Sequence, residues 1–432
     1  MTLLVLSSND VDELASTFSP DELQLLMARV FARLSHSSSR SRTGIKDPGI
    51  SMPHRINIQM ANHTVLFMPA RLGPSEAPVV ATSEVATTGT LEPGSTAIKV
   101  VSIPKASGIH GLPATTLVLD EVTGGIKAIV NARKLTALRN AAGMSLYSEA
   151  CKNSITKKLR ALKTGSLLST TLVGLSYPQS IVAFGAGQQI ESHLDLHIRH
   201  FPSIVRCTVV NRQLNERAVS LRDRLNVRYP AVEIDVLASD SMRPGEQSGN
   251  PSEIEIALRS TDIIICATSS TSPLFPSSWV KDGTHVILIG SYTPTMQEVD
   301  KTLILRALGK RSPTTDTDGL TSIPTLLVDS REACSHEAGE LINAAIKPEQ
   351  VTEIGELVLT DEYGNLSMEA YLQLLSVKRT RNPREERFDG PVTIFKSVGV
   401  GLQDVAIANV IVNKALSLVD KKIGTSIDSY DL

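Results

Sequence analysis

The feature that most constrains this chain is a regular alternation of apolar runs and helix-length segments that begins at Ser180. Buried parallel strands read as continuous apolar runs, and joining two of them takes a crossover of about a dozen residues or more. The alternation therefore predicts an α/β fold with a doubly wound parallel sheet. Six strands are expected at Ile181–Phe184, Cys207–Val210, Val232–Leu237, Asp262–Ala267, His285–Ile289 and Leu326–Val328.

A glycine turn directly follows the first of these strands and precedes a helical pattern over 188–200. Gly185 permits a tight turn, Gly187 lets the backbone approach a pyrophosphate, and the helix start offers free amide donors and a positive dipole end. A third glycine would stand at Ile190, so this fingerprint is incomplete. We predict a Rossmann-type dinucleotide-binding domain whose phosphate-binding residues are Gly185, Ala186, Gly187, Gln188 and Gln189.

The end of the second strand bears on which dinucleotide binds. NAD-binding units commonly place an acid there for the ribose hydroxyl, whereas this chain has Asn211 and Arg212. Because no carboxylate stands here, nothing would repel the 2′-phosphate of NADP, and the guanidinium of an arginine pairs well with such a phosphate. The sequence therefore favours NADP over NAD. A solvated arginine at a strand end is the alternative interpretation.

The region before residue 160 predicts a separate α+β domain. It has a helical rhythm over 9–34, a Ser/Arg-rich break over 35–42 that we expect to be a mobile loop, and short strands at 64–68, 97–101, 115–119 and 126–130. A long helix is expected over 136–162 and a final apolar one over 404–418. We assign 1–160, completed by 390–432, to a substrate-binding domain and 161–389 to the Rossmann domain, with surface insertions at 239–252 and 309–322.

Basic residues in the first domain could hold a substrate carboxylate, namely Arg55, Lys99 and Arg139. Lys99 interrupts an apolar strand, where a buried ammonium would need an anionic partner; from composition alone, an edge lysine facing water is the more common case. The helix after the glycine turn carries His193, His197 and His200, which we interpret as surface residues because a third metal ligand is missing. No metal site is expected.

Charge and hydropathy exclude several classes of partner. With 43 basic and 45 acidic side chains, the net charge of −2 provides no footprint for nucleic acid or an anionic membrane. The apolar runs are too short to cross a bilayer, and the N-terminal stretch is not typical of a signal peptide. The widely spaced Cys151, Cys207, Cys266 and Cys334 are expected to be core thiols. A cytoplasmic protein is predicted.

At this point the chain resembles the ornithine cyclodeaminase and mu-crystallin family along most of its length. The ordered matches are Met52-Pro53-His54-Arg55, Phe67-Met68-Pro69, Ile98-Lys99-Val100, Leu135-Thr136-Ala137-Leu138-Arg139-Asn140-Ala141-Ala142, Phe184-Gly185-Ala186-Gly187-Gln188-Gln189, Val209-Val210-Asn211-Arg212, Ala267-Thr268-Ser269, Val328-Asp329-Ser330-Arg331-Glu332-Ala333, Ala338-Gly339-Glu340-Leu341 and Ile394-Phe395-Lys396-Ser397-Val398-Gly399. Together they are more specific than the glycine turn alone.

The resemblance implies a homodimer built through the first domain and an active site in the cleft between the two domains. It implies that Arg55 and Arg139 hold the substrate carboxylate and that Lys99 lies beside the reacting carbon and nitrogen. It also places a further set of residues against the nicotinamide half of the cofactor: Ala267, Thr268, Ser269, Gly290, Ser291, Ser397 and Val398.

Departures from the family pattern favour a simple reaction. Tyr292 stands where cyclodeaminases have an aspartate, Leu66 replaces a glutamate, and Ile190 and Asn140 replace smaller or hydroxyl residues. A tyrosine with a pKa near ~10 cannot act as a carboxylate at neutral pH. We therefore predict an oxidoreductase, an NAD(P)H-dependent reductase of a cyclic ketimine carboxylate, with Tyr292 near the substrate. The alternatives are an ornithine or lysine cyclodeaminase and a non-catalytic, crystallin-like binding protein.

Overall fold

The computed structural model describes most of the chain in two compact units. The described residues are 2–18, 20–42, 49–76, 91–92, 94–105, 112–133, 135–137, 165–173, 175, 177–239, 251–308, 325–358, 388, 390–418 and 421–430. One unit contains the elements from the N-terminus to β9 together with the C-terminal elements α13 and β18, and the other contains the elements from α5 to β16 together with β17.

A mixed eight-stranded sheet forms the first unit. Its strands are β1 (Leu3–Leu6), β2 (Ile50–Ser51), β3 (Ile56–Gln59), β4 (His63–Leu72), β7 (Ser95–Pro104), β8 (Ala114–Leu119), β9 (Ile126–Asn131) and β18 (Thr425–Ile427). The order is β18-β1-β9-β8-β7-β4-β2, with β3 also paired to β4. The four predicted strands are confirmed as β4, β7, β8 and β9, and β5 (Ser75–Glu76) with β6 (Leu91–Glu92) forms a separate ribbon.

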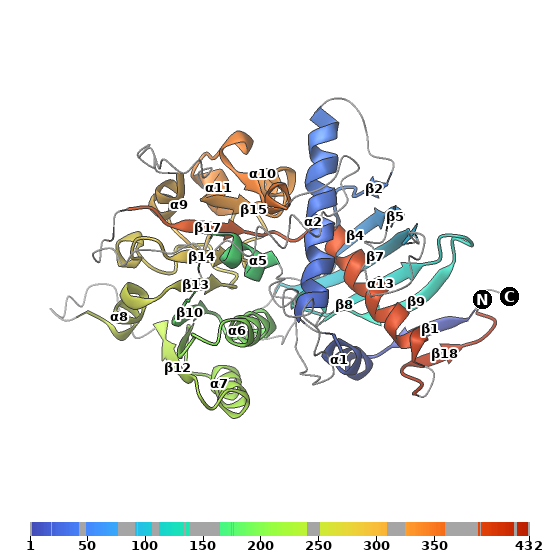
Figure 1. Ribbon diagram of the computed structural model, residues 1–432, viewed down its shortest axis with the longest axis horizontal. Coiled ribbons are helices and arrows are strands. Elements are labelled where there is room, and N and C mark those ends of the chain that lie inside the picture. Colours follow the sequence, from blue (N-terminus) through green and yellow to red (C-terminus); the bar gives the residue numbers. More distant parts are fainter. Residues whose placement is uncertain are drawn as a thin grey trace, which may run out of the picture. The chain divides into compact units, whose positions relative to one another are not determined.

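The long helices described in this unit are α1 (Ser8–Ser16), α2 (Pro20–Arg42) and α13 (Gly401–Ser417). α13 crosses the sheet over β4 and β7 and packs beside α2 (Figure 1). The prediction of a loop over 35–42 was wrong, because α2 continues through this stretch, which contains neither glycine nor proline to end it. Of the long helix expected over 136–162, only residues 136 and 137 lie within the described part of the chain.

The second unit contains an eight-stranded sheet in which every pairing is parallel. Its strands are β10 (Ser180–Phe184), β11 (Arg206–Asn211), β12 (Glu233–Ala238), β13 (Ile263–Cys266), β14 (His285–Leu288), β15 (Leu326–Val328), β16 (Thr352–Glu353) and β17 (Thr393–Lys396). The order β12-β11-β10-β13-β14-β17-β15-β16 confirms the doubly wound α/β sheet.

Strand β17 corrects one predicted boundary. It lies between β14 and β15, although the segment from residue 390 onward was assigned to the first domain. The chain rejoins the first unit only at Val400. The buried run Ile394-Phe395 explains the position of β17, because an inner parallel strand must be covered on both faces.

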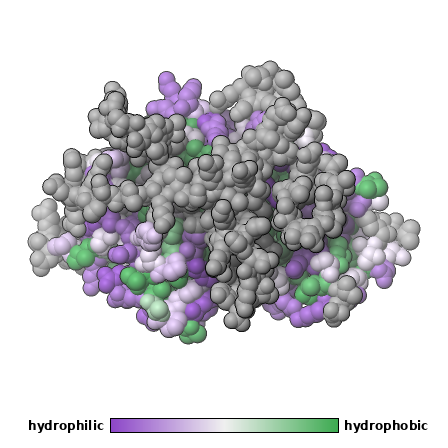
Figure 2. Space-filling model, in the orientation of Figure 1, coloured by the Kyte–Doolittle hydropathy of each residue, from purple (hydrophilic) through white to green (hydrophobic). Residues whose placement is uncertain are grey.

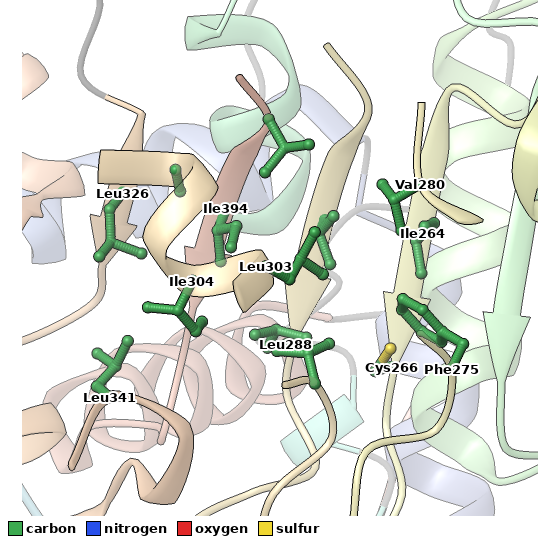
Figure 3. Close-up of a cluster of buried hydrophobic side chains, with 14 of the residues drawn as sticks. Ile264, Cys266, Phe275, Val280, Leu288, Leu303, Ile304, Leu326, Leu341 and Ile394 are labelled. Carbon is green, nitrogen blue, oxygen red and sulfur yellow. The ribbon is translucent and has the colours of Figure 1, made fainter. Parts of the chain in front are cut away.

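The helices of this unit connect and cover the sheet. Among the described residues they are α5 (Gly165–Leu172), α6 (Gln188–His200), α7 (Glu216–Arg228), α8 (Glu253–Ser260), α9 (Lys301–Leu308), α10 (Arg331–Glu337) and α11 (Gly339–Asn343), with the short 3₁₀ turns η2 (Ser277–Trp279) and η3 (Pro348–Gln350). A further 3₁₀ turn, η4 (Ile354–Leu357), begins at the last residue of the segment Ser166–Ile354 and continues in the first unit. Figure 3 shows Leu303 and Ile304 of α9 among Leu288, Leu326 and Ile394 of the strands. This apolar layer packs against β13, β14, β15 and β17 and holds these strands in place.

The exposed residues are of mixed polarity (Figure 2), and the described cysteines are buried. On the face seen in Figure 2, hydrophobic residues lie in small groups among hydrophilic ones. Of the helices that the structure describes, none is long and apolar enough to cross a membrane. Cys207, Cys266 and Cys334 are buried free thiols, as predicted, while Cys151 and nearly all of the two insertions lie outside the described residues.

Candidate functional site

The residues expected to bind the cofactor follow strand ends that form one row across the second sheet. Phe184 pairs with Cys266, Cys266 with Leu288, and Leu288 with Lys396. Because these strands are parallel, the residues that come next in each strand lie along one edge, its carboxyl edge. The chain leaves β10 for β11 on one side and returns to β13 on the other, so the edge includes a topological switch point, where open α/β sheets bind ligands.

The glycine turn after β10 has the geometry that phosphate binding requires. Gly185 has a φ of +109°, which side chains rarely adopt, and a Cβ there would lie 3.0 Å from the Ala267 carbonyl oxygen. Gly187 caps the start of α6 without a side-chain hydrogen bond, and a Cβ there would meet nothing within 4 Å. Gly187 therefore borders open space beside the amide donors of a helix N-terminus, which suits an anion.

The neighbouring residues of this turn differ in exposure. Ala186 is buried, Gln189 is half-buried and Gln188 is exposed. Ile190, which stands where a third glycine is usual, is fully buried and lies against Gly185. The larger side chain is thus accommodated inside the unit and does not occupy the space in front of Gly187.

Two loops after β13 and β14 meet at a buried carboxylate, Glu298. Its Oε1 accepts hydrogen bonds from the Thr268 backbone N–H at 2.6 Å and the Thr268 hydroxyl at 2.9 Å. Its Oε2 accepts from the Gly290 N–H at 2.8 Å. A Cβ on Gly290 would lie 2.0 Å from the Thr268 carbonyl oxygen, so only glycine fits where the loops touch. Ser269 is exposed beside them.

Glu298 belongs to a wholly buried charged group with Glu340 and Lys396. Glu340 accepts from the Glu298 N–H at 3.0 Å and the Ser291 hydroxyl at 2.7 Å, and it lies 3.5 Å from the Lys396 ammonium. Lys396 donates to the Ser291 carbonyl at 2.5 Å. Burial raises the pKa of Glu298, which Lys396 partly opposes. The group joins the carboxyl ends of three neighbouring strands.

The loop after β17 is held by a second buried carboxylate, Asp329. It accepts from the Ser397 hydroxyl and the Gly399 N–H, both at 2.7 Å. The Ser397 hydroxyl, expected to face the nicotinamide, therefore points into the unit, and Val398 is buried next to it.

The end of β11 is open to solvent. Arg212 is exposed directly after the strand, and the Asn211 side-chain amide donates to the Gln213 carbonyl at 2.8 Å. This hydrogen bond orients the Asn211 side chain along the turn. A guanidinium in this position is accessible to an anionic ligand.

Lys99 lies in the first unit and has a definite partner. Its ammonium donates to Asp404 Oδ1 at 3.0 Å, and the two side chains are 2% and 3% exposed. Asp404 stands in the first turn of α13, where the helix dipole also favours a carboxylate. The structure thus excludes an edge lysine facing water and supplies the anionic partner that a buried ammonium needs.

The other predicted substrate residues are placed only in part. Arg55 is half-buried just before β3, whose first residue Ile56 pairs with Phe67 of β4; Lys99 pairs with Met68, the next residue of β4. Tyr292 is half-buried in the loop after β14, in the second unit. Arg139 lies outside the described residues.

The expectation that the α6 histidines are surface residues was wrong for two of them. His193 and His197 are fully buried, and burial lowers their pKa values to about 4 and about 3. Each Nδ1 lies 2.7–2.8 Å from the carbonyl four residues earlier, and His197 Nε2 lies 3.2 Å from the Thr170 hydroxyl of α5. The hydrogen bonds of the neutral imidazoles to their own helix offset part of the cost of burial, although the His193 Nε2 atom has no hydrogen-bond partner among the described residues. Within the described residues, no cluster suits a metal ion.

Several buried charged residues have no role in the sequence-based prediction. Asp329, Glu340, Lys396 and the Asp404 of the final helix all interrupt apolar runs. A charge inside an apolar run was the signal that singled out Lys99, and it could have singled out these four residues as well. Glu298 follows a polar loop, and no sequence pattern marks it.

Residues 179–418 match the sequence model of the ornithine cyclodeaminase/mu-crystallin family. The chain belongs to this family. The iminosuccinate reductase of Paracoccus denitrificans is 26% identical over 304 residues, which cover 70% of each chain. The family assignment confirms the predicted resemblance and makes the chain an enzyme of the imine reductase, amino-acid dehydrogenase or cyclodeaminase type.

Solved structures share this fold. The Δ1-pyrroline-2-carboxylate reductase of Thermococcus litoralis, determined with NADH and L-proline, aligns with a TM-score of 0.64 at 21% identity, over 98% of this chain and 100% of that chain. An archaeal alanine dehydrogenase dimer with bound NAD aligns with a TM-score of 0.63 at 20% identity, over 100% of each chain. At these identities the likeness supports the fold alone, and it confirms the predicted fold class.

Proposed function

We propose that this chain is an NAD(P)H-dependent reductase that converts a cyclic ketimine carboxylate into the corresponding amino acid. The observation that carries the proposal is the open space at Gly187, beside the free amides of α6 and next to the switch point between β10 and β13. This combination suits the pyrophosphate of a dinucleotide. The relatives named above act on imines or amino acids, which agrees with a small carboxylate substrate.

The preferred cofactor is NADPH. Arg212 is exposed where the adenosine ribose lies in Rossmann-type units, and its neighbour Asn211 carries no charge to repel a phosphate. A guanidinium forms charge-assisted hydrogen bonds with a 2′-phosphate. The two solved relatives were determined with NADH and NAD, so the preference for NADPH rests on this chain's own residues.

In this proposal Lys99 is the catalytic residue, and Arg55 and Arg139 hold the substrate carboxylate. When bound, the cofactor supplies the hydride that the imine carbon receives. Lys99 donates a proton to the imine nitrogen, so the carbon–nitrogen double bond becomes a single bond. The hydride and the proton together give a neutral amine, and Lys99 is left as a neutral amine. Asp404 keeps the Lys99 ammonium oriented and stabilises its charge in a buried position.

The residues available favour reduction over cyclodeamination. Expelling ammonia and closing a ring calls for a carboxylate near the reacting amine, and Tyr292 and Leu66 stand at the positions where the family resemblance implied acids. Leu66 is buried within β4, so it provides no polar group. Tyr292 serves instead as a substrate-binding side chain.

The reaction assay decides between these activities. The purified full chain is mixed with NADPH or NADH and five- or six-membered cyclic ketimine carboxylates, and loss of nicotinamide absorbance is followed. We expect turnover, faster with NADPH, and loss of turnover in Lys99→Met with NADPH affinity retained. Ammonia release from ornithine or lysine without net change in the cofactor would contradict the reductase and support a cyclodeaminase. Binding without any turnover would support the non-catalytic alternative.

We also propose that the chain forms a homodimer through the first unit and acts in the cytoplasm. On β3, Ile56 and Ile58 are 60% and 50% exposed, and Met60 just after the strand is 53% exposed. Alternate residues of a strand share one face, so these side chains form an apolar stripe on a strand that pairs with β4 alone in the described structure. A second copy is the expected partner, as in the alanine dehydrogenase dimer. Buried free thiols agree with a reducing compartment.

A further inference from the structure

One buried carboxylate of the second unit, Glu298, forms hydrogen bonds with both the loop after β13 and the loop after β14. Glu298 uses both oxygens to accept from the backbone N–H groups of Thr268 and Gly290, at 2.6 and 2.8 Å. It is fully buried, so solvent cannot replace these bonds if they are lost. The two loops carry residues of the predicted nicotinamide-facing set.

The two loops also pack closely against each other, which restricts their backbone conformations. A Cβ on Gly290 would lie 2.0 Å from the Thr268 carbonyl oxygen and 2.3 Å from the Thr268 nitrogen. The loop backbones are therefore in direct contact, and Glu298 bridges them on the inner side. Glu298 is itself anchored, because its N–H donates to Glu340 and its carbonyl accepts from the Leu274 N–H at 2.9 Å.

Further hydrogen bonds of Glu340 and Lys396 connect these two loops to the end of β17. Glu340 also accepts from the Ser291 hydroxyl, and Lys396 at the end of β17 donates to the Ser291 carbonyl. The group carries two carboxyls and one ammonium among atoms that are wholly buried. Such a buried polar network rigidifies its surroundings when its donors and acceptors are satisfied.

We infer that Glu298 is a positioning residue for the dinucleotide, because it fixes the loops 267–269 and 289–291 in the arrangement that receives the nicotinamide half. Because its side chain is fully buried, Glu298 would act through the loop backbones and not by direct contact. The inference rests on the proposed function, in which the dinucleotide binds along the carboxyl edge of this sheet. A preorganised edge binds without spending free energy on ordering two loops, so loosening it lowers affinity.

The test is the substitution Glu298→Gln, measured as the Kd of NADPH by fluorescence titration of the full chain. An amide has one oxygen, so its NH₂ group would face the N–H of either Gly290 or Thr268, and one hydrogen bond becomes a donor–donor contact. We expect the Kd to rise about tenfold or more, and the KM for NADPH to rise while the KM for the ketimine changes little.

The matched control is Asp262→Asn. Asp262 accepts from the Gln179 N–H at 2.8 Å and from Lys281 at 2.9 Å, at the opposite edge of the same sheet. We expect this variant to lose stability without a change in the Kd of NADPH. Equal effects of the two variants on the Kd would overturn the inference, because general destabilisation would then explain both.

Two further outcomes separate the inference from the proposed function. A folded Glu298→Gln variant with the wild-type Kd would overturn the inference alone, whereas a wild-type chain that binds neither NADPH nor NADH would overturn the proposed function. If Glu298→Gln does not fold, Ser291→Ala removes one donor to Glu340 from the same network. A Kd raised about threefold would then support the inference, and an unchanged Kd in folded protein would contradict it.

Discussion

The buried pair Lys99–Asp404 permits a quantitative prediction about stability. The two charged groups are 3.0 Å apart and almost inaccessible to solvent. With an effective dielectric constant of ~20, their attraction is about 5 kcal/mol, and removing one partner of a buried pair typically costs roughly 3–5 kcal/mol because the other charge stays buried. Lys99→Met and Asp404→Asn should therefore each lower the free energy of unfolding by roughly 3–5 kcal/mol.

The double variant should lose much less than the sum of the two single losses. Urea unfolding followed by circular dichroism supplies the four free energies of a double-mutant cycle, and we expect a coupling energy of about 2–4 kcal/mol. The exposed pair Glu13–Lys421 of the same unit, with side chains 44% and 67% exposed, serves as the control, with an expected coupling below about 1 kcal/mol. Additivity of the Lys99 and Asp404 losses to within about 0.5 kcal/mol would refute the reasoning.

Three more predictions concern the cofactor, the assembly and the response to acid. In fluorescence titrations, Arg212→Gln should raise the Kd of NADPH about tenfold and leave the Kd of NADH unchanged. An equal rise in both Kd values would refute the 2′-phosphate contact. Ile58→Lys should convert a dimer to a monomer in sedimentation experiments, and a wild-type monomer would contradict the proposed interface. His193 stays neutral when folded, with a pKa lowered to about 4, so stability should fall as the pH drops from about 6.5 towards 4. In urea titrations His193→Gln should flatten this fall and the exposed His336→Gln should not; equal slopes would contradict this account.

Local patterns in the sequence were sufficient for six of the eight strands of the second sheet and for the glycine turn, but not for β16 and β17. Parallel strands buried on both faces read as apolar runs, and the positive φ of Gly185 and the open space at Gly187 agree with the roles expected of these glycines. β17 was assigned to the wrong domain because its four residues reach the middle of the sheet from a distant part of the chain. Short apolar runs alone do not indicate which sheet they enter.

The ion pair between Lys99 and Asp404 could not be predicted, because its partners also come from distant parts of the chain. Lys99 and Asp404 are 305 residues apart in the chain, and only the packing of α13 on the first sheet brings them together. Glu298 was missed because its hydrogen-bond partners are backbone N–H groups of two loops, which leave no trace in residue type. The α6 histidines were assigned to the surface because a third metal ligand is missing, whereas the rings of His193 and His197 are buried and hydrogen-bond through Nδ1 to carbonyls of their own helix.

The most direct test of the account is a calorimetric titration of the full chain and of Gly187→Ala with NADPH and NADH. A Cβ at Gly187 meets no protein atom within 4 Å, so the variant should unfold within about 1 kcal/mol of the wild type. The account predicts that the wild type binds both dinucleotides and that the added methyl group, placed in the phosphate space, weakens binding at least about tenfold. Undiminished affinity in the variant, or a folded wild type that binds neither dinucleotide, would contradict it.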